Sequence, residues 1–128
     1  MKLLLDTCTF IWITQGIDNL SDLVIEAFAN PQNAVFLSAV SVWEICVKHH
    51  MGKLKLPIPP EIFIPKERRR HMITKLPLSE KDIFPLLKLP PIHKDPFDRM
   101  LICQAIEHGL TILTPDEAIQ AYPVKTLW

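Results

Sequence analysis

The stretch Leu3-Leu4-Leu5-Asp6-Thr7 decides the fold of this 128-residue chain. Its consecutive leucines, preceded by Lys2, predict a short buried strand. Asp6 follows at once, so a carboxylate lies where the strand ends. In open α/β sheets, ligands bind in the crevice outside the carboxyl ends of the strands. Asp6 is therefore a candidate binding residue from its position alone.

The same arrangement, an acid after an apolar run or at an expected helix start, recurs along the chain at three places: Glu44 after 35–37, Asp98, and Asp116 after 110–113. If the apolar runs are parallel strands, their carboxyl ends converge on one crevice. Several carboxylates in one crevice repel each other, and a hard divalent cation with a preference for oxygen ligands makes them tolerable. The pattern predicts metal-dependent phosphotransfer or nuclease chemistry.

Each acid also has a simpler explanation as a helix cap. Asp6 could cap the helix that follows it, and Ser41-Val42-Trp43-Glu44 has the S-x-x-E form of a capping box. Asp95-Pro96 fits an N-cap and first helical residue, which leaves Asp98 in the first turn. Thr114-Pro115-Asp116-Glu117 fits the same scheme. Spacing alone leaves a convergent site and separate caps both open.

Strands and helices are expected to alternate. Strands are expected over 2–5, 34–37, 72–78, 110–113 and 124–127, and helices over 7–14, from Ser21, from Ser38 or Ser41 to about Met51, from Ser79, and from Asp95 to Gly109. Segment 53–65 contains four prolines and is expected to be loop with at most a short helix. The alternation predicts an α/β fold with a parallel sheet, and the length predicts one domain over 1–128.

Composition excludes several classes. The 48% hydrophobic and 22% charged residues argue against disorder, and a net charge of +0 carries no nucleic-acid signal. No apolar stretch approaches the ~20 residues that span a bilayer, so no membrane partner is expected. Cys8, Cys46 and Cys103 have no metal-type spacing and fit reduced thiols. A cytoplasmic location is expected.

Five segments, taken in order, resemble the PIN-domain family: Leu3-Leu4-Leu5-Asp6-Thr7, 37–45, 52–56, 95–102 and 113–116. More narrowly, the chain resembles the VapC-type toxins of type II toxin–antitoxin modules, from Met1 to Trp128. The resemblance implies a three-layer α/β/α fold with a mostly parallel sheet, a Mg²⁺ or Mn²⁺ site, and hydrolysis of single-stranded RNA. It also implies a cognate antitoxin, whose tail would lie near the acids, and a homodimer.

The resemblance assigns catalysis and metal binding, by position, to Asp6, Glu44, Asp98 and Asp116. Asp6 and Asp98 are expected to coordinate directly. The other two acids would act through water, accept the proton of the nucleophile or hold a second ion. Thr7 and Thr114 match family positions that orient the carboxylates, and Ser41 is expected to do the same. Asp95 is expected to cap the helix and to support the site from behind the metal ligands. Cys8 departs from the family, which often has His or Asn there.

RNA contacts are expected from basic residues: Lys48, Lys53, Arg68, Arg69, Arg70 and Arg99. The His93 ring is expected to contact backbone or solvent near a loop rather than to take part in catalysis. Trp43 is expected to pack in the core, with an apolar contact to a partner as the alternative.

Two other functions compete with the nuclease. A receiver-type phosphoacceptor also places acids at strand ends, but it needs paired acids early in the chain, whereas Asp6 is followed by Thr7 and Cys8. A catalytically silent PIN-like module that binds protein or RNA is the main alternative. The target RNA and the number of metal ions stay open.

Overall fold

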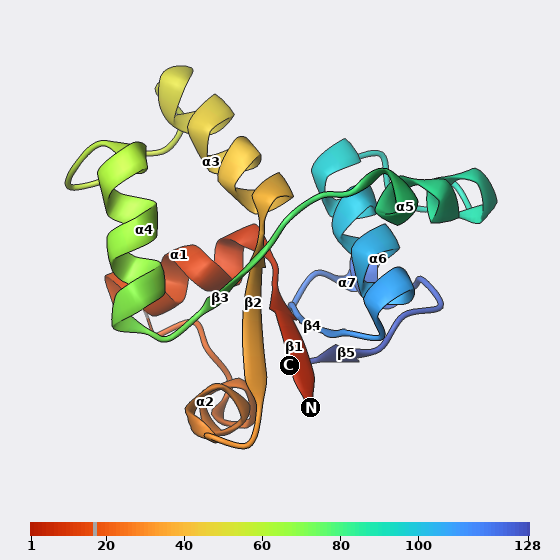
Figure 1. Cartoon of the computed structure of the whole chain (residues 1–128), viewed down its shortest axis with the longest axis horizontal. Coiled ribbons are helices and arrows are strands. Elements are labelled where there is room, and N and C mark those ends of the chain that lie inside the picture. Colours follow the sequence, from red (N-terminus) through yellow and green to blue (C-terminus); the bar gives the residue numbers. More distant parts are fainter. Residues whose placement is uncertain (17) are drawn as a thin grey trace.

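Five parallel strands form one sheet in the order β3-β2-β1-β4-β5 (Figure 1). The structure is a computed structural model that describes residues 1–16 and 18–128. The strands are β1 (Lys2–Leu5), β2 (Ala34–Ser38), β3 (Thr74–Leu76), β4 (Thr111–Leu113) and β5 (Thr126–Leu127). The predicted strands are confirmed, although the third, fourth and fifth are shorter than expected.

The helices that alternate with these strands are α1 (Thr7–Gln15), α2 (Asp22–Ala29), α3 (Ala39–His50), α4 (Pro60–Arg70), α5 (Glu80–Ile83), the 3₁₀ helix η1 (Phe84–Lys88), α6 (Pro96–His108) and α7 (Glu117–Gln120). Within the described ranges 1–16 and 18–128, no helix is both long and apolar enough to cross a membrane.

The leucines of β1 are buried on both faces of the sheet. Leu3 and Leu5 pack with the apolar side chains of α1, α2 and α4, whereas Leu4 packs with those of α6 and α7. All three are 0% exposed. Since successive side chains of a strand point to opposite faces, the sheet must be covered on both sides. Figure 1 shows α4 and α6 on opposite sides of it, and the expected three-layer α/β/α fold is confirmed.

The structure shows which of two serines, Ser38 or Ser41, caps helix α3. Ser38, the last residue of β2, caps the helix, because its Oγ accepts a hydrogen bond from the Val40 N–H at 3.0 Å. The strand runs into the helix without a loop, so Ser41 already lies inside the first turn. The alternative in which Ser41 and Glu44 form a capping box is therefore excluded, and the Glu44 side chain does not cap this helix.

Segment 53–65 was expected to be loop with at most a short helix. Residues 53–59 do lie outside helices and strands, but the helix that follows has 11 residues and is longer than expected. Helix α4 begins at Pro60 and continues through Pro65. Proline is tolerated at the first helical position because that residue's N–H would have no partner within the helix. Pro65 removes one internal hydrogen bond, while Phe63 and Ile64 beside it are 3% and 2% exposed. Burial of these side chains offsets the lost bond.

A buried polar network ties α3 to α6. Ser38 Oγ donates to Gln104 Oε1, and Gln104 Nε2 donates to Asp82 Oδ2 at 3.1 Å and to the Pro77 carbonyl at 3.2 Å. His108 Nε2 lies 2.7 Å from Asp82 Oδ1. Burial alone would raise the pKa of Asp82, but hydrogen bonds from Gln104, Ser79 and His108 outweigh it and lower the pKa. The network fixes the two helices that carry Glu44 and Asp98.

Candidate active site

The four acids predicted from the sequence line one cavity of about 310 Å³ beyond the carboxyl ends of β1 and β4. The residues around it are Asp6, Thr7, Cys8, Trp12, Glu44, Lys48, His93, Asp95, Asp98, Pro115 and Asp116. Two of the acids also cap helices, since Asp6 Oδ1 accepts from the Thr9 N–H and Asp116 Oδ1 from the Ala118 N–H, both at 2.8 Å. Capping and convergence, which the sequence left as alternatives, both occur.

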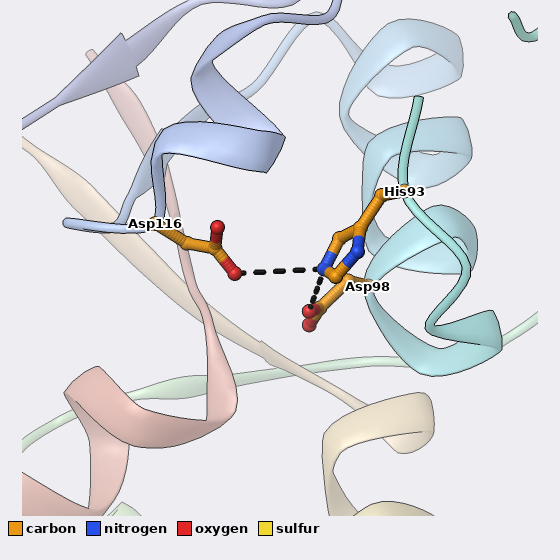
Figure 2. Close-up of side chains that lie close together, drawn as sticks. All are labelled: His93, Asp98 and Asp116. Carbon is orange, nitrogen blue, oxygen red and sulfur yellow. Dashed lines mark hydrogen bonds and ion pairs between the residues drawn. The ribbon is translucent and has the colours of Figure 1, made fainter. Parts of the chain in front are cut away.

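His93, Asp98 and Asp116 form a cluster in the cavity, with one potential ligand atom from each within 4.8 Å of the others (Figure 2). His93 Nε2 lies 2.8 Å from Asp98 Oδ2 and 3.5 Å from Asp116 Oδ2. The backbone N–H of His93 donates to the hydroxyl of Tyr122 at 2.8 Å. The expectation that this ring contacts only backbone or solvent is wrong. No periodicity could have revealed it, because His93 lies in the irregular segment between η1 and α6.

Asp6 lines the same cavity and is buried, at 5% exposed. Burial raises the pKa of its carboxyl, the side chains of Thr114 and Thr9 oppose that rise by hydrogen bonding, and the negative charge of Asp116 adds to it. Thr114 Oγ1 also accepts from the Asp116 N–H at 3.1 Å. Thr114 thus contacts both acids. The N-cap of α7 is Asp116, and not Thr114 as the sequence suggested.

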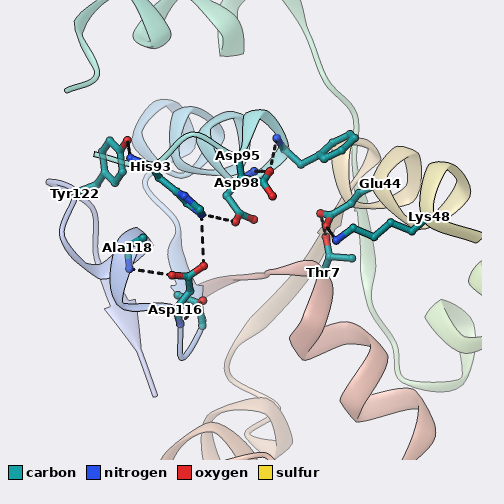
Figure 3. Close-up of polar contacts among 11 residues, drawn as sticks. Thr7, Glu44, Lys48, His93, Asp95, Asp98, Asp116, Ala118 and Tyr122 are labelled. Atoms are coloured by element: carbon teal, nitrogen blue, oxygen red, sulfur yellow. Dashed lines mark hydrogen bonds and ion pairs between the residues drawn. The ribbon is translucent and has the colours of Figure 1, made fainter. Parts of the chain in front are cut away.

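Glu44 reaches the opposite side of the cavity from α3 (Figure 3). Thr7 Oγ1 donates to Glu44 Oε1 at 2.6 Å, and Lys48 Nζ pairs with Glu44 Oε2. Ser41 precedes Glu44 by one helical turn, but it is 0% exposed, does not line the cavity, and its hydroxyl has no hydrogen-bond partner among the described residues. The structure brings Thr7 to the carboxylates and leaves Ser41 outside.

Asp98 carries the clearest electrostatic signature of the site. Burial raises the pKa of Asp98 to about 6; the charges of Asp95 and Glu44 also raise it, and His93 opposes the rise. Asp95 lies close because it caps α6, accepting from the Phe97 and Asp98 N–H groups at 2.8 and 3.1 Å. The ionised form is thus disfavoured by its neighbours. A bound cation would reverse that field, so the donor set suits a divalent metal.

Among the six predicted RNA-binding residues, only Lys48 lines this cavity. Arg68 lines a separate cavity with Val42 and Lys75, and Arg99 lines an apolar one with Trp43. Neither Lys53 nor the remaining pair, Arg69 and Arg70, borders the acids. The structure therefore gathers the acids far more closely than the bases.

Two neighbours of the site differ from expectation or from the family pattern. Trp43 is 58% exposed, with its ring edge-on to Phe97 at 4.8 Å between centroids, so the prediction of core packing is wrong. Cys8 borders the cavity, and burial together with the charges of Asp6 and Glu44 raises the pKa of its thiol to about 11. The thiol is therefore neutral near pH 7.

The sequence model of the PIN domain matches residues 3–125. The chain belongs to the PIN-domain family. Among curated proteins, Ribonuclease VapC16 of Mycobacterium tuberculosis is 41% identical over 39 residues, which cover 30% of this chain and 28% of that relative. The chain thus aligns with less than a third of the length of that relative.

Solved structures share the whole fold at low sequence identity. VapBC2 from Rickettsia felis, bound to a promoter DNA fragment, contains a chain with a TM-score of 0.73 and 15% identity, covering 99% of this PIN domain and 98% of that chain. DNA-bound VapBC from Salmonella typhimurium gives a TM-score of 0.69 at 18% identity, covering 99% and 97%. These likenesses establish the fold.

Replacing Asp95 by Asn tests the electrostatics of Asp98. Asparagine also caps helices well, so Asp95→Asn keeps α6 intact while removing one negative charge. In metal-free protein we expect Asp98 to titrate at about 6 and the variant to titrate lower. Carboxyl ¹³C NMR measures both midpoints, and Asp22→Asn, at an exposed site on α2, should leave the Asp98 midpoint unchanged. A wild-type midpoint near 4 would contradict this account.

Proposed function

We propose that this chain is a metal-dependent endoribonuclease that acts as the toxin of a toxin–antitoxin pair. The observation that carries the proposal is the meeting of four carboxylates and His93 in one cavity at the carboxyl edge of a parallel sheet. The name of the partial relative, a ribonuclease, and those of the structural neighbours, VapBC assemblies, agree with it.

Asp6, Asp98 and Asp116 would hold the metal, Mg²⁺ or Mn²⁺. Such an ion lowers the pKa of a bound water to generate a nucleophile and stabilises charge on the transferring phosphoryl group. The protein's own contribution is position. Thr114 orients two of the three acids by contacting both Asp6 and Asp116, and Asp95 fixes the backbone of Asp98.

Glu44 and Lys48 would act on the reacting groups from α3. The Glu44 carboxylate is held by Thr7 and Lys48 in the wall of the cavity, where it could accept the proton of the nucleophile or hold a water. The Lys48 ammonium also lines the cavity and offers the phosphate backbone a positive contact that does not depend on sequence. The other basic residues would hold RNA farther from the cut.

Two protein contacts complete the proposal. An antitoxin tail would lie near the acids, where a cationic side chain complements their charge. A second copy of the chain would cover the apolar surface formed by Trp43, Phe84 and Leu87, which are 58%, 58% and 85% exposed. These side chains border or adjoin a cavity of about 460 Å³ lined by Trp43, Leu78, Ile83 and Leu86. Large exposed apolar side chains around an apolar cavity are typical of interaction sites.

Cleavage of a panel of structured RNAs tests the activity. We expect wild-type protein to cut with Mg²⁺ or Mn²⁺, to stop in chelator, and to lose roughly 100-fold or more of its rate in Asp6→Asn and Asp98→Asn. Asp22→Asn, on exposed α2, is the matched control and should retain the wild-type rate. Circular dichroism establishes that the variants fold.

Two results would oppose the nuclease. Cutting that persists in chelator or in both variants would contradict the metal mechanism. Binding of RNA or a partner by folded, metal-loaded wild type, without cutting of any RNA tested, would identify the silent binding module.

Sedimentation equilibrium tests the second copy. We expect a dimer whose dissociation constant rises at least about tenfold in Phe84→Asp and Leu87→Asp, because a charge replaces exposed apolar contact area. Ile62→Asp, at a 55% exposed site on α4, is the control and should dimerise normally. A wild-type chain that stays monomeric at tens of micromolar would contradict the proposed homodimer.

A further inference from the structure

We propose that His93 binds the metal directly through Nε2, and that this nitrogen makes the site favour a first-row transition metal ion over Mg²⁺. The inference rests on the proposed metal site and adds a ligand that the carboxylate pattern alone does not supply. The starting observation is that one atom from each of His93, Asp98 and Asp116 lies within 4.8 Å of the others.

The spacing of these atoms fits a single coordination sphere. Metal–ligand bonds of about 2.0–2.1 Å place adjacent ligand atoms about 3.0 Å apart in an octahedron and about 3.4 Å apart in a tetrahedron. His93 Nε2 is 2.8 Å from Asp98 Oδ2 and 3.5 Å from Asp116 Oδ2. In Figure 2 the imidazole edge points between the two carboxylates. A cation can therefore reach all three groups with only small side-chain shifts.

Hydrogen bonds from outside the cluster position all three residues, two of them through the backbone and one through the carboxylate. The His93 backbone is anchored to the hydroxyl of Tyr122, a residue that is 3% exposed. Asp116 is oriented by its cap contact to Ala118, and the backbone of Asp98 by Asp95 (Figure 3). Because these contacts fix the three residues on separate segments of the chain, the fold itself brings the donors together.

The donor chemistry decides the preferred ion. Mg²⁺ takes oxygen ligands and keeps several waters, whereas imidazole nitrogen suits ions such as Zn²⁺, Fe²⁺ and Ni²⁺ best, and Mn²⁺ accepts it more readily than Mg²⁺ does. An imidazole ligand adds a donor atom without adding to the negative charge of the carboxylates. Without His93, the remaining donors in the cavity would be those of an ordinary oxygen-ligand site.

The competing arrangement is that His93 only donates Nε2–H to Asp98 and is displaced when metal enters. The two arrangements differ in whether nitrogen is bonded to the ion. They also differ in what His93→Gln does: loss of a ligand weakens transition-metal binding selectively, whereas loss of a displaced donor leaves the preference between ions unchanged.

Mn²⁺ binding, followed by electron paramagnetic resonance, separates them without any RNA. Pulsed measurements on bound Mn²⁺ should show ¹⁴N coupling in wild type and lose it in His93→Gln. Titration should show Mn²⁺ affinity falling roughly tenfold or more in that variant, while Mg²⁺ affinity, measured by competition, changes less than about threefold. His50→Gln, at an exposed site at the end of α3, is the matched control and should behave as wild type.

The outcomes distinguish this inference from the function on which it rests. Mn²⁺ bound in the cavity without ¹⁴N coupling in wild type would overturn His93 as a ligand and leave the ribonuclease proposal standing. Unchanged ion preference in His93→Gln would also overturn it. Failure of folded wild type to bind Mn²⁺ or Mg²⁺ would overturn both proposals. The ¹⁴N measurement on wild type needs no variant, so the test survives a variant that does not fold.

Discussion

The parallel pairing of β1 with both β2 and β4 is the constraint on which the site depends. Leu3 pairs with Val35 on one side and with Thr111 on the other, so the three strands end at the same edge. Because the strands are parallel, the residues that follow each strand lie at this same edge. Asp6 follows β1, α3 with Glu44 follows β2, and Asp116 follows β4. Asp98 joins them from the first turn of α6. Burial of β1 on both faces stabilises this edge.

The convergence of the four carboxylates is electrostatically unfavourable, and contacts elsewhere in the fold must offset it. The pKa of Asp98 is raised to about 6, and that of Asp6 is raised as well, so the folded chain holds carboxylates where ionisation is disfavoured. Helices that could relieve the repulsion by moving apart are tied together: the network of Ser38, Gln104 and Asp82 joins the start of α3 to α6. The residual field is what a divalent cation would neutralise.

Local patterns in the sequence predicted the sheet, the sandwiching helices and the four acids, because burial on both faces and acids after strands leave short-range signals. The failures have a different origin. Pro65 lies inside α4 because burial of its neighbours in the core outweighs one lost hydrogen bond. The capping-box pattern at Ser41 does not mark the helix start, because β2 runs straight into α3 and Ser38 is the N-cap. His93 reaches the acids through an irregular segment anchored by Tyr122. Such long-range contacts have no period and no motif, so only the structure reveals them.

Anomalous diffraction from crystals containing Mn²⁺ tests the central claim most directly, since it locates the ion relative to the converging carboxylates. The account predicts a peak in the cavity within bonding distance, about 2.0–2.3 Å, of carboxylate oxygens from both Asp98 and Asp116. No peak there at saturating Mn²⁺, or a peak only at a site remote from these acids, would contradict it.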